Sequence, residues 1–474
     1  MSQDLINKYY KALLSDETTA KTALKELKKE SEELNTVLLE KFSPLLKNFK
    51  KKKLSDLPSI LKKIANKKCS YAQEMGLWLI PPFDEQIEIF EYDRSKKLQD
   101  IPEELKVLKN LKSIKLPKNT ISGIPNFIGN FDNLEILNLH YNRITSLPKA
   151  ISKLSNLKYL YLGFNFLETL PEFIGKLEQL EYLNVAYNAN RRHGDNIFAA
   201  FPKALGKLSN LKTLLASGNV LTEIPETIRK LVKLEKLYLA TGKISHVPEW
   251  IGELSELKEL DLAVNKGITS LPESIGDLTK LEKLVLQRCN LSKLPKSIGN
   301  LPQLHTLEID GNQLTILPKS IGNLAQLSTF SLNKNKFTQL PNSIGDLTQL
   351  TYLDLEQGDL ESLPETIGQL TELTGLILSH NQIKTLPNSI GALKKVEKLY
   401  VYNNQLEILP KSIGDMENLK VLSLSKNNLK TLPESIAKLK NLTHLFLTEN
   451  PLSTDEKEKE RIEDLLPRTT IDYV

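Results

Sequence analysis

An apolar residue followed by proline recurs along most of this chain at a nearly constant interval. The step occurs fifteen times, from Ile101-Pro102 to Leu432-Pro433, and its spacing is 23 residues except for 171 to 202, which is 31, and 248 to 272, which is 24. A fixed period of this size is the signature of a repeat architecture. It outweighs the length of 474 residues, which alone would suggest about three globular domains.

Each interval contains the pattern LxxLxLxxNxL, which is complete at Leu304–Leu314. The alternating apolar and polar residues predict a short strand with one buried face. The proline then ends strand pairing and is suited to the first position of a helical turn, with glycine as the stop, as in Pro318 to Gly322. Only one or two turns fit, so we expect short 3₁₀ or irregular segments opposite the strands.

Fifteen such units run from Leu111 to Leu452. One unit cannot bury its own leucines, whereas stacked units form a continuous core and their strands form one parallel sheet. The sequence therefore predicts a solenoid whose concave face is a curved sheet.

The asparagine of each unit occupies what we call the ladder position. We expect its amide to be buried and to satisfy backbone groups of its own turn and the next, because buried polar groups require partners. Gly242, Cys289 and Gly358 replace it in three units, where we expect a weaker ladder, by about 1–3 kcal/mol per lost buried bond. The twelve asparagines are Asn119, Asn142, Asn165, Asn188, Asn219, Asn265, Asn312, Asn335, Asn381, Asn404, Asn427 and Asn450.

The full pattern, Leu-Pro-x-Ser-Ile-Gly-x-Leu-x-x-Leu-x-x-Leu-x-Leu-x-x-Asn-x-Leu, resembles the 23-residue leucine-rich repeats of the Ras-group-related class, which includes scribble, erbin and the Ras-suppressor proteins. It is also similar to arrays that are common in bacterial proteins. The resemblance covers about residues 98–474. It implies an α/β leucine-rich-repeat solenoid that binds proteins, and it names no partner.

The two ends differ from the repeats. Residues 1–85 carry apolar residues at helical spacing and predict an α-helical region, read either as an enlarged cap or as a separate interaction or dimerisation module. The solenoid then spans residues 86–452, with an irregular first turn at 86–92. Residues 453–474 predict a C-terminal cap, in which Ser453 caps an amphipathic helix and Ile471 and Tyr473 lie in a short closing strand.

The charge distribution gives little reason to expect nucleic acid as a partner. Residues 1–68 hold 16 Lys and Arg against 9 Asp and Glu, which leaves 47 against 49 for the rest. The net charge of +5 is therefore local to the N-terminus. Its lysine run, Lys50–Lys53, could contact an acidic lipid or nucleic-acid surface, although such a run is more often a solvated helix face.

No motif in the sequence indicates catalysis, a metal or a cofactor. The P-loop, dinucleotide, HExxH and GxSxG patterns are absent, and Cys69 and Cys289 lie too far apart in the chain to suggest a thiolate site. We therefore expect a protein that is not an enzyme and that binds no cofactor and no metal. Without an apolar run of about 18 residues or a signal-peptide pattern, we expect a cytoplasmic protein with no transmembrane segment.

The second to fourth repeats place aromatic residues on the predicted concave side. Exposed aromatic clusters are candidate binding sites, although tyrosine also simply suits strands. The 31-residue interval inserts a polar loop beside them, and its two arginines suit an acidic or phosphorylated protein partner unless the insertion has no function. The residues are His140, Tyr141, Tyr159, Tyr161, Phe164, Tyr182 and Tyr187, followed by Arg191 and Arg192.

Charged residues alternate along later strands, with basic residues between the acidic ones. An open sheet offers no closed pocket that would raise a carboxyl pKa for catalysis, so we expect a mixed-charge partner surface. Its candidate contacts are Asp261, Glu308, Asp354 and Glu356. A smaller aromatic spot combines Tyr400 and Tyr402 with His444 and Phe446.

These features favour a bacterial, cytoplasmic protein-binding scaffold that recognises its partner on the concave sheet, with the aromatic zone as the first candidate. The alternative is a translocated bacterial effector that uses the same surface on a host protein. Partner identity and oligomeric state stay open.

Overall fold

The computed structural model describes residues 89–91, 97–108, 110–188 and 198–473. The helical region expected at 1–85 lies outside these residues, and so do Cys69, Arg191 and Arg192. The chain divides into two compact units, one of residues 1–197 and 202–211 and the other of residues 198–201 and 212–474. Neither unit contains, within its described residues, a helix that is long and apolar enough to cross a membrane.

The first unit contributes one three-residue strand per repeat, and each strand pairs in parallel with the next. The register follows the repeat, because Leu137 lies opposite Leu160 and Leu160 opposite Leu183, each fully buried. The strands are β1 (Ile89–Glu91), β2 (Ser113–Lys115), β3 (Ile136–Asn138), β4 (Tyr159–Tyr161) and β5 (Tyr182–Asn184).

The second unit repeats this arrangement, and its strands pair in parallel from β6 to β17. The strands β2–β16 match the fifteen predicted units, β1 lies in the expected irregular first turn, and β17 is the expected closing strand. The strands are β6 (Thr213–Leu215), β7 (Lys236–Tyr238), β8 (Glu259–Asp261), β9 (Lys283–Val285), β10 (Thr306–Glu308), β11 (Thr329–Ser331), β12 (Tyr352–Asp354), β13 (Gly375–Ile377), β14 (Lys398–Tyr400), β15 (Val421–Ser423), β16 (His444–Phe446) and β17 (Thr470–Asp472).

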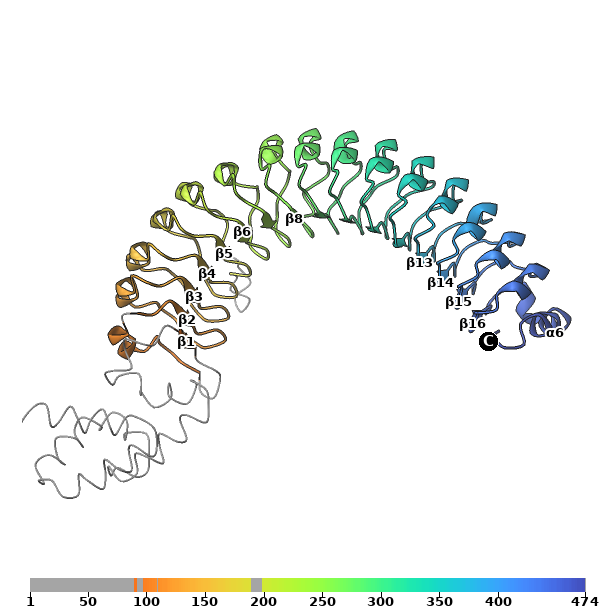
Figure 1. The fold of residues 1–474 in the computed structure, drawn as a ribbon, viewed down its shortest axis with the longest axis horizontal. Coiled ribbons are helices and arrows are strands. Elements are labelled where there is room, and N and C mark those ends of the chain that lie inside the picture. Colours follow the sequence, from red (N-terminus) through yellow and green to blue (C-terminus); the bar gives the residue numbers. More distant parts are fainter. Residues whose placement is uncertain (1–88, 92–96, 109, 189–197, 474) are drawn as a thin grey trace, which may run out of the picture. The chain divides into compact units, whose positions relative to one another are not determined.

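A short 3₁₀ helix follows the proline of each repeat, as predicted, and within each unit these helices lie on the side opposite the strands (Figure 1). The first unit contains η4 (Glu103–Val107), η5 (Asn126–Asn130), η6 (Lys149–Lys153), η7 (Glu172–Lys176) and η8 (Lys203–Lys207). The second contains η9 (Glu226–Lys230), η10 (Glu249–Glu253), η11 (Glu273–Asp277), η12 (Lys296–Asn300), η13 (Lys319–Asn323), η14 (Asn342–Asp346), η15 (Glu365–Gln369), η16 (Asn388–Ala392), η17 (Lys411–Asp415), η18 (Glu434–Lys438) and η19 (Pro451–Thr454).

The predicted role of the repeat glycine as a helix stop is wrong. Gly322 lies inside η13, which ends one residue later, before Leu324. A Cβ atom on Gly322 would lie 2.5 Å from the carbonyl oxygen of Ser343 in the next repeat. Glycine is therefore required because successive 3₁₀ helices pack closely, and the same contact recurs at Gly345 against Thr366, at 2.4 Å.

The asparagines at the ladder position are buried, as predicted. Asn312 is typical, since its Oδ1 accepts a hydrogen bond from the Leu291 amide at 3.0 Å and its Nδ2 donates to the carbonyls of Leu286 and Ile309 at 2.9 and 2.8 Å. Such an asparagine joins its own turn to the preceding repeat, and the same contacts recur at Asn335 and Asn427.

The three replacements reduce this bonding. The thiol of Cys289 donates to the Leu262 carbonyl at 3.4 Å, which is a weak bond. Gly242 and Gly358 have no side chain, and the amides that an asparagine there would bind, those of Leu221 and Phe337, have no hydrogen-bond acceptor among the described residues. The lower stability of these repeats stays a prediction.

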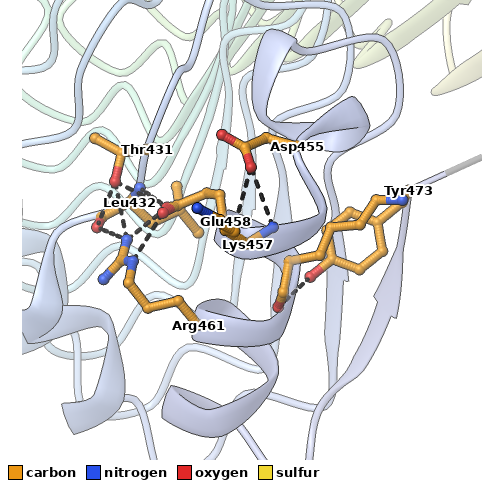
Figure 2. A network of polar contacts seen from close by, with 8 residues as sticks. Thr431, Leu432, Asp455, Lys457, Glu458, Arg461 and Tyr473 are labelled. Carbon is orange, nitrogen blue, oxygen red and sulfur yellow. Dashed lines mark hydrogen bonds and ion pairs between the residues drawn. The ribbon is translucent and has the colours of Figure 1, made fainter.

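The C-terminal segment folds as a short helix and a strand, but Ser453 does not cap the helix as expected. It lies in η19 and donates to the Asn450 carbonyl at 2.8 Å, whereas Asp455 is the N-cap of α6 (Glu456–Leu465). Asp455 can serve because its extended backbone directs its carboxylate to the amides of Lys457 and Glu458, at 3.1 and 3.3 Å (Figure 2).

The helix α6 is attached to the last repeat by polar contacts and by apolar burial. Glu458 accepts hydrogen bonds from the Thr431 hydroxyl and the Leu432 amide, at 2.8 and 3.0 Å, and Arg461 donates to the Leu432 carbonyl at 2.6 Å (Figure 2). Ile462 and Leu466 are buried beneath it, as expected. Leu465 is only half-buried.

Candidate functional site

The residue before each ladder position has a left-handed backbone. Every positive φ among the described residues falls at this position, with glycine at only two of them, Gly218 and Gly311. Side chains with a Cβ rarely adopt this conformation, and bulky ones do so at a cost. In the first unit the position holds Tyr141, Phe164 and Tyr187, with φ of 56°, 54° and 53°.

These three aromatic rings form a continuous stack, which we call the aromatic stack. The rings of Tyr141 and Phe164 lie 4.2 Å apart and those of Phe164 and Tyr187 4.7 Å apart, tilted by only 19° and 20°. The spacing matches that of neighbouring parallel strands, so equivalent residues of successive repeats meet face to face. Lys118 lies over the outer face of Tyr141, 5.7 Å from the ring centre, and Tyr141 is 42% exposed.

His140 packs edge-on against this stack. Its ring centre lies 4.5 Å from that of Tyr141 and 5.2 Å from that of Phe164. Gly163 makes room for it, because a Cβ there would lie 2.7 Å from the imidazole Cε1. The Nδ1 atom is enclosed and has no hydrogen-bond partner within the described part of the chain. Burial, assisted by the charge of Lys118, lowers the pKa of His140, which favours the neutral ring.

The other predicted tyrosines form a separate group on the strands, which we call the tyrosine cluster. Tyr159 and Tyr161 flank the buried centre of β4, and Tyr182 begins β5. The ring of Tyr182 lies 4.7 Å from that of Tyr161 and 6.4 Å from that of Tyr159. Burial raises the pKa of Tyr161 and of Tyr182, so both keep their hydroxyl protons. The predicted aromatic zone thus consists of turn residues and strand residues.

In the second unit, two of the four predicted acidic residues bond to their own turns. Asp261 accepts a hydrogen bond from the Ala263 amide and Asp354 from the Glu356 amide, both at 3.0 Å. Such a bond stabilises the turn after a strand, which is a structural role that the sequence analysis missed. Asp354 is also largely buried, at 8% exposed.

Several of the alternating charges form ion pairs between adjacent strands. Lys283 lies 3.1 Å from Glu308, and Lys236 lies 2.7 Å from Glu259. Pairs of this kind neutralise one another along the face, so they contribute less to a partner surface than isolated charges would. Across the described ranges, no three His, Cys, Asp or Glu side chains are grouped so that they could hold a metal ion.

The predicted C-terminal aromatic spot does not form as one group. Tyr402 contacts His380 of the preceding repeat, with ring centres 4.6 Å apart, whereas His444 stacks on Phe446 at 6.3 Å. Residues of equal repeat position lie 23 residues apart, so His380 is the equivalent of Asn403 and Tyr402 precedes that residue by one. The spacing of 22 residues between His380 and Tyr402 was therefore the available signal.

Comparisons with known proteins identify the protein family to which this repeat geometry belongs. The family described as "Leucine-rich repeat region" matches residues 86–199, 260–336 and 319–407, and the family "Leucine rich repeat" matches residues 407–452. These matches cover more than half of the chain, which therefore belongs to the leucine-rich-repeat family. No curated protein matches the chain.

Similar solved structures include bacterial and plant proteins. A leucine-rich-repeat protein of Leptospira interrogans is 36% identical, with a TM-score of 0.75, over 84% of this chain and 98% of that one. The plant peptide hormone receptor RGFR1 in complex with RGF2 is 30% identical, with a TM-score of 0.65, over 78% of this chain and 60% of the receptor. The ectodomain of the Arabidopsis receptor kinase HAESA in complex with an IDA peptide hormone ligand is 29% identical, with a TM-score of 0.58, over 74% and 64%.

Proposed function

We propose that this protein is a non-enzymatic scaffold that binds a protein partner, and that the aromatic stack with the tyrosine cluster is its main contact surface. One observation carries the proposal. Tyr141, Phe164 and Tyr187 occupy three successive left-handed positions where glycine or asparagine would fit with less strain. The left-handed backbone itself recurs in every repeat, so the distinguishing feature here is the continuous stack of three rings with Tyr141 42% exposed, and exposed aromatic clusters are typical of binding sites.

The chemistry of the surface suits a protein. Aromatic rings provide a large contact area with little loss of side-chain entropy, and they are enriched among the residues that dominate binding energy. The three phenols of the tyrosine cluster, Tyr159, Tyr161 and Tyr182, add polar atoms to an apolar face. Two of the similar structures are receptors bound to peptide ligands, which supports protein binding as the activity of this fold.

The finer features belong to the same proposal. Arg191 and Arg192, in the inserted loop, would favour an acidic or phosphorylated partner. Residues 1–85 would form an N-terminal helical region, residues 86–452 the binding solenoid and residues 453–474 its cap. The repeat pattern supports assignment to the Ras-group-related class, and the Leptospira protein supports a bacterial origin. A cytoplasmic location is part of the same proposal.

The test is capture of partners by the full chain and by two matched variants. The first variant replaces Tyr141, Phe164 and Tyr187 by asparagine, which tolerates the left-handed backbone. The control replaces Lys334 and Gln357 by asparagine at the same backbone position in the second unit. Partners retained by the natural chain and the control, but lost from the first variant, are expected. Equal retention by all three proteins would refute the proposal.

The alternative, a translocated effector that binds a host protein through the same surface, is tested separately. A reporter fused to the first few dozen residues would be secreted by the specialised apparatus of the source bacterium if the chain were an effector. A reporter retained in the cell supports the cytoplasmic scaffold.

A further inference from the structure

Three carboxylates on the second unit lack a cationic partner. Asp310, Asp354 and Glu356 form no ion pair with any residue in the described ranges, unlike Glu308 in the same region. Neutral groups bind two of them instead. Gln287 donates to Asp310 at 2.9 Å, and Asn333 donates to Asp354 at 2.9 Å. Neutral donors leave the negative charge uncompensated, so this part of the sheet attracts cations.

Tyr352 lies beside these carboxylates and is 37% exposed. Its ring packs against Gly375 on the neighbouring strand, where a Cβ would lie 3.1 Å from Cδ2. Burial raises the pKa of Tyr352, and Asp354, Glu356 and Asp310 raise it further. The Tyr352 side chain is therefore affected by the negative charges of all three carboxylates.

A chain of hydrogen bonds holds Tyr402 toward the same carboxylates. Asn403 donates from Nδ2 to Nδ1 of His380 at 2.6 Å, which leaves the His380 Nε2 proton to bind the Tyr402 hydroxyl at 2.6 Å. The hydroxyl proton of Tyr402 is then directed to Glu356, and the burial and hydrogen bonding of that hydroxyl raise its pKa.

Ser379 occupies the same repeat position as Glu356 and Tyr402 and lies between them along the sheet. It is only 1% exposed, and its hydroxyl has no hydrogen-bond partner in the part of the chain that is described. An enclosed hydroxyl without a partner is uncommon in folded proteins. Its unused donor and acceptor lie in the repeat between those of an acid and a phenol.

We propose that this acid–tyrosine surface, formed by Asp310, Tyr352, Asp354, Glu356, Ser379 and Tyr402, docks an extended, arginine-bearing segment of a partner protein. A guanidinium group fits because it binds carboxylates in a bidentate manner and stacks on aromatic rings. A compact ammonium group can also lie over a ring, as Lys118 does at Tyr141, but unlike a guanidinium group it neither stacks flat on the ring nor binds a carboxylate in a bidentate manner. The inference rests on the proposed scaffold function and specifies the partner chemistry of the second unit.

Fluorescence anisotropy of labelled peptides with the full chain tests the inference. Peptides of about eight residues are long enough to cross β10–β14. Four compositions are compared: arginine-bearing, lysine-bearing with equal charge, neutral and glutamate-bearing. We expect the arginine peptide to bind most tightly, and we expect its affinity to fall as salt rises from about 50 to 200 mM.

Three variants locate the binding. Glu356→Gln and Tyr352→Ala should each lower the affinity for the arginine peptide about tenfold. The first removes a charged contact and the second a stacking contact. Glu361→Gln is the matched control, since it makes the same charge change at an exposed loop residue outside the surface. It should leave the affinity unchanged, and thermal melting checks that all three variants fold.

Two results would overturn the inference. Equal affinity for arginine and lysine peptides, with no effect of Tyr352→Ala, would mean attraction by charge alone. Binding that is lost in Phe164→Asn but kept in Glu356→Gln would place basic segments on the aromatic stack, which would leave the scaffold function intact. The failure of this inference is therefore distinct from failure of the proposed function.

Discussion

Phe164 stacks face to face on Tyr141 at 4.2 Å although both residues have a left-handed backbone. The stacking is made possible by that conformation, because it gives the same direction to side chains at the same position of successive repeats. Two opposing contributions to stability therefore act at Phe164. The left-handed backbone is unfavourable for a bulky side chain, whereas the ring contacts are favourable.

Phe164→Asn should separate these two contributions. Asparagine relieves backbone strain of about 1 kcal/mol or more, whereas loss of the three ring contacts, to Tyr141, Tyr187 and His140, costs about 0.5–1.5 kcal/mol each. We expect the free energy of unfolding to fall by no more than about 3 kcal/mol, while partner binding falls. Urea denaturation and partner capture measure the two effects. A larger loss of stability would show that the rings serve the fold rather than binding.

Asn312→Ala should be strongly destabilising. It removes one acceptor and two donor interactions from a residue that is 2% exposed, and it leaves the Leu291 amide without its acceptor. A loss of about 2–4 kcal/mol is expected. Cys289→Ala, at the ladder position of the preceding repeat, removes only a weak thiol bond and should cost less than about 2 kcal/mol. Urea denaturation compares them, and equal losses would contradict the ladder interpretation.

Gly322→Ala should destabilise by about 1–3 kcal/mol, because the added methyl group would overlap the Ser343 carbonyl oxygen. Gly123→Ala is the matched control, since no atom lies within 4 Å of a Cβ there. Thermal unfolding measures both. If alanine were tolerated equally at the two sites, close packing of the 3₁₀ helices would not explain the repeat glycine.

His140 makes stability depend on pH in a defined direction. Because burial and Lys118 lower its pKa below the ordinary value of 6.5, the native state binds fewer protons than the unfolded chain. The contribution is fully present above about pH 6.5 and is lost as pH falls toward the native pKa. His140→Phe should reduce the fall in the urea midpoint between about pH 7.5 and 5.5. His444→Phe, at an exposed strand residue, should not.

The repeat pattern was sufficient to predict most of the architecture. The register of Leu137, Leu160 and Leu183 follows from equal spacing, since residues one repeat apart must lie side by side. The buried ladder asparagine and the 3₁₀ helix after each proline follow from the same periodicity. Such features repeat fifteen times, so a local ambiguity in one unit is resolved by the others.

The errors concern contacts between particular neighbours. The position of Gly322 inside its helix depends on how near Ser343 lies, and no spacing within one repeat gives that distance. The bond from Asp354 to its own turn and the packing of Tyr352 on Gly375 are equally specific to their side chains. Aligning the repeats by ladder position would have placed Tyr352 beside a glycine, which was the available signal.

The short strand β17 has a consequence for the behaviour of the protein in solution. It pairs with His444–Phe446 of β16 and so occupies hydrogen-bonding groups that would otherwise face water. Deleting residues 455–474 would expose β16 as an open sheet edge, together with the apolar surface under Ile462 and Leu466. Exposed edges recruit strands from other molecules. We therefore expect the closing segment to limit aggregation, in addition to shielding the last leucines of the solenoid.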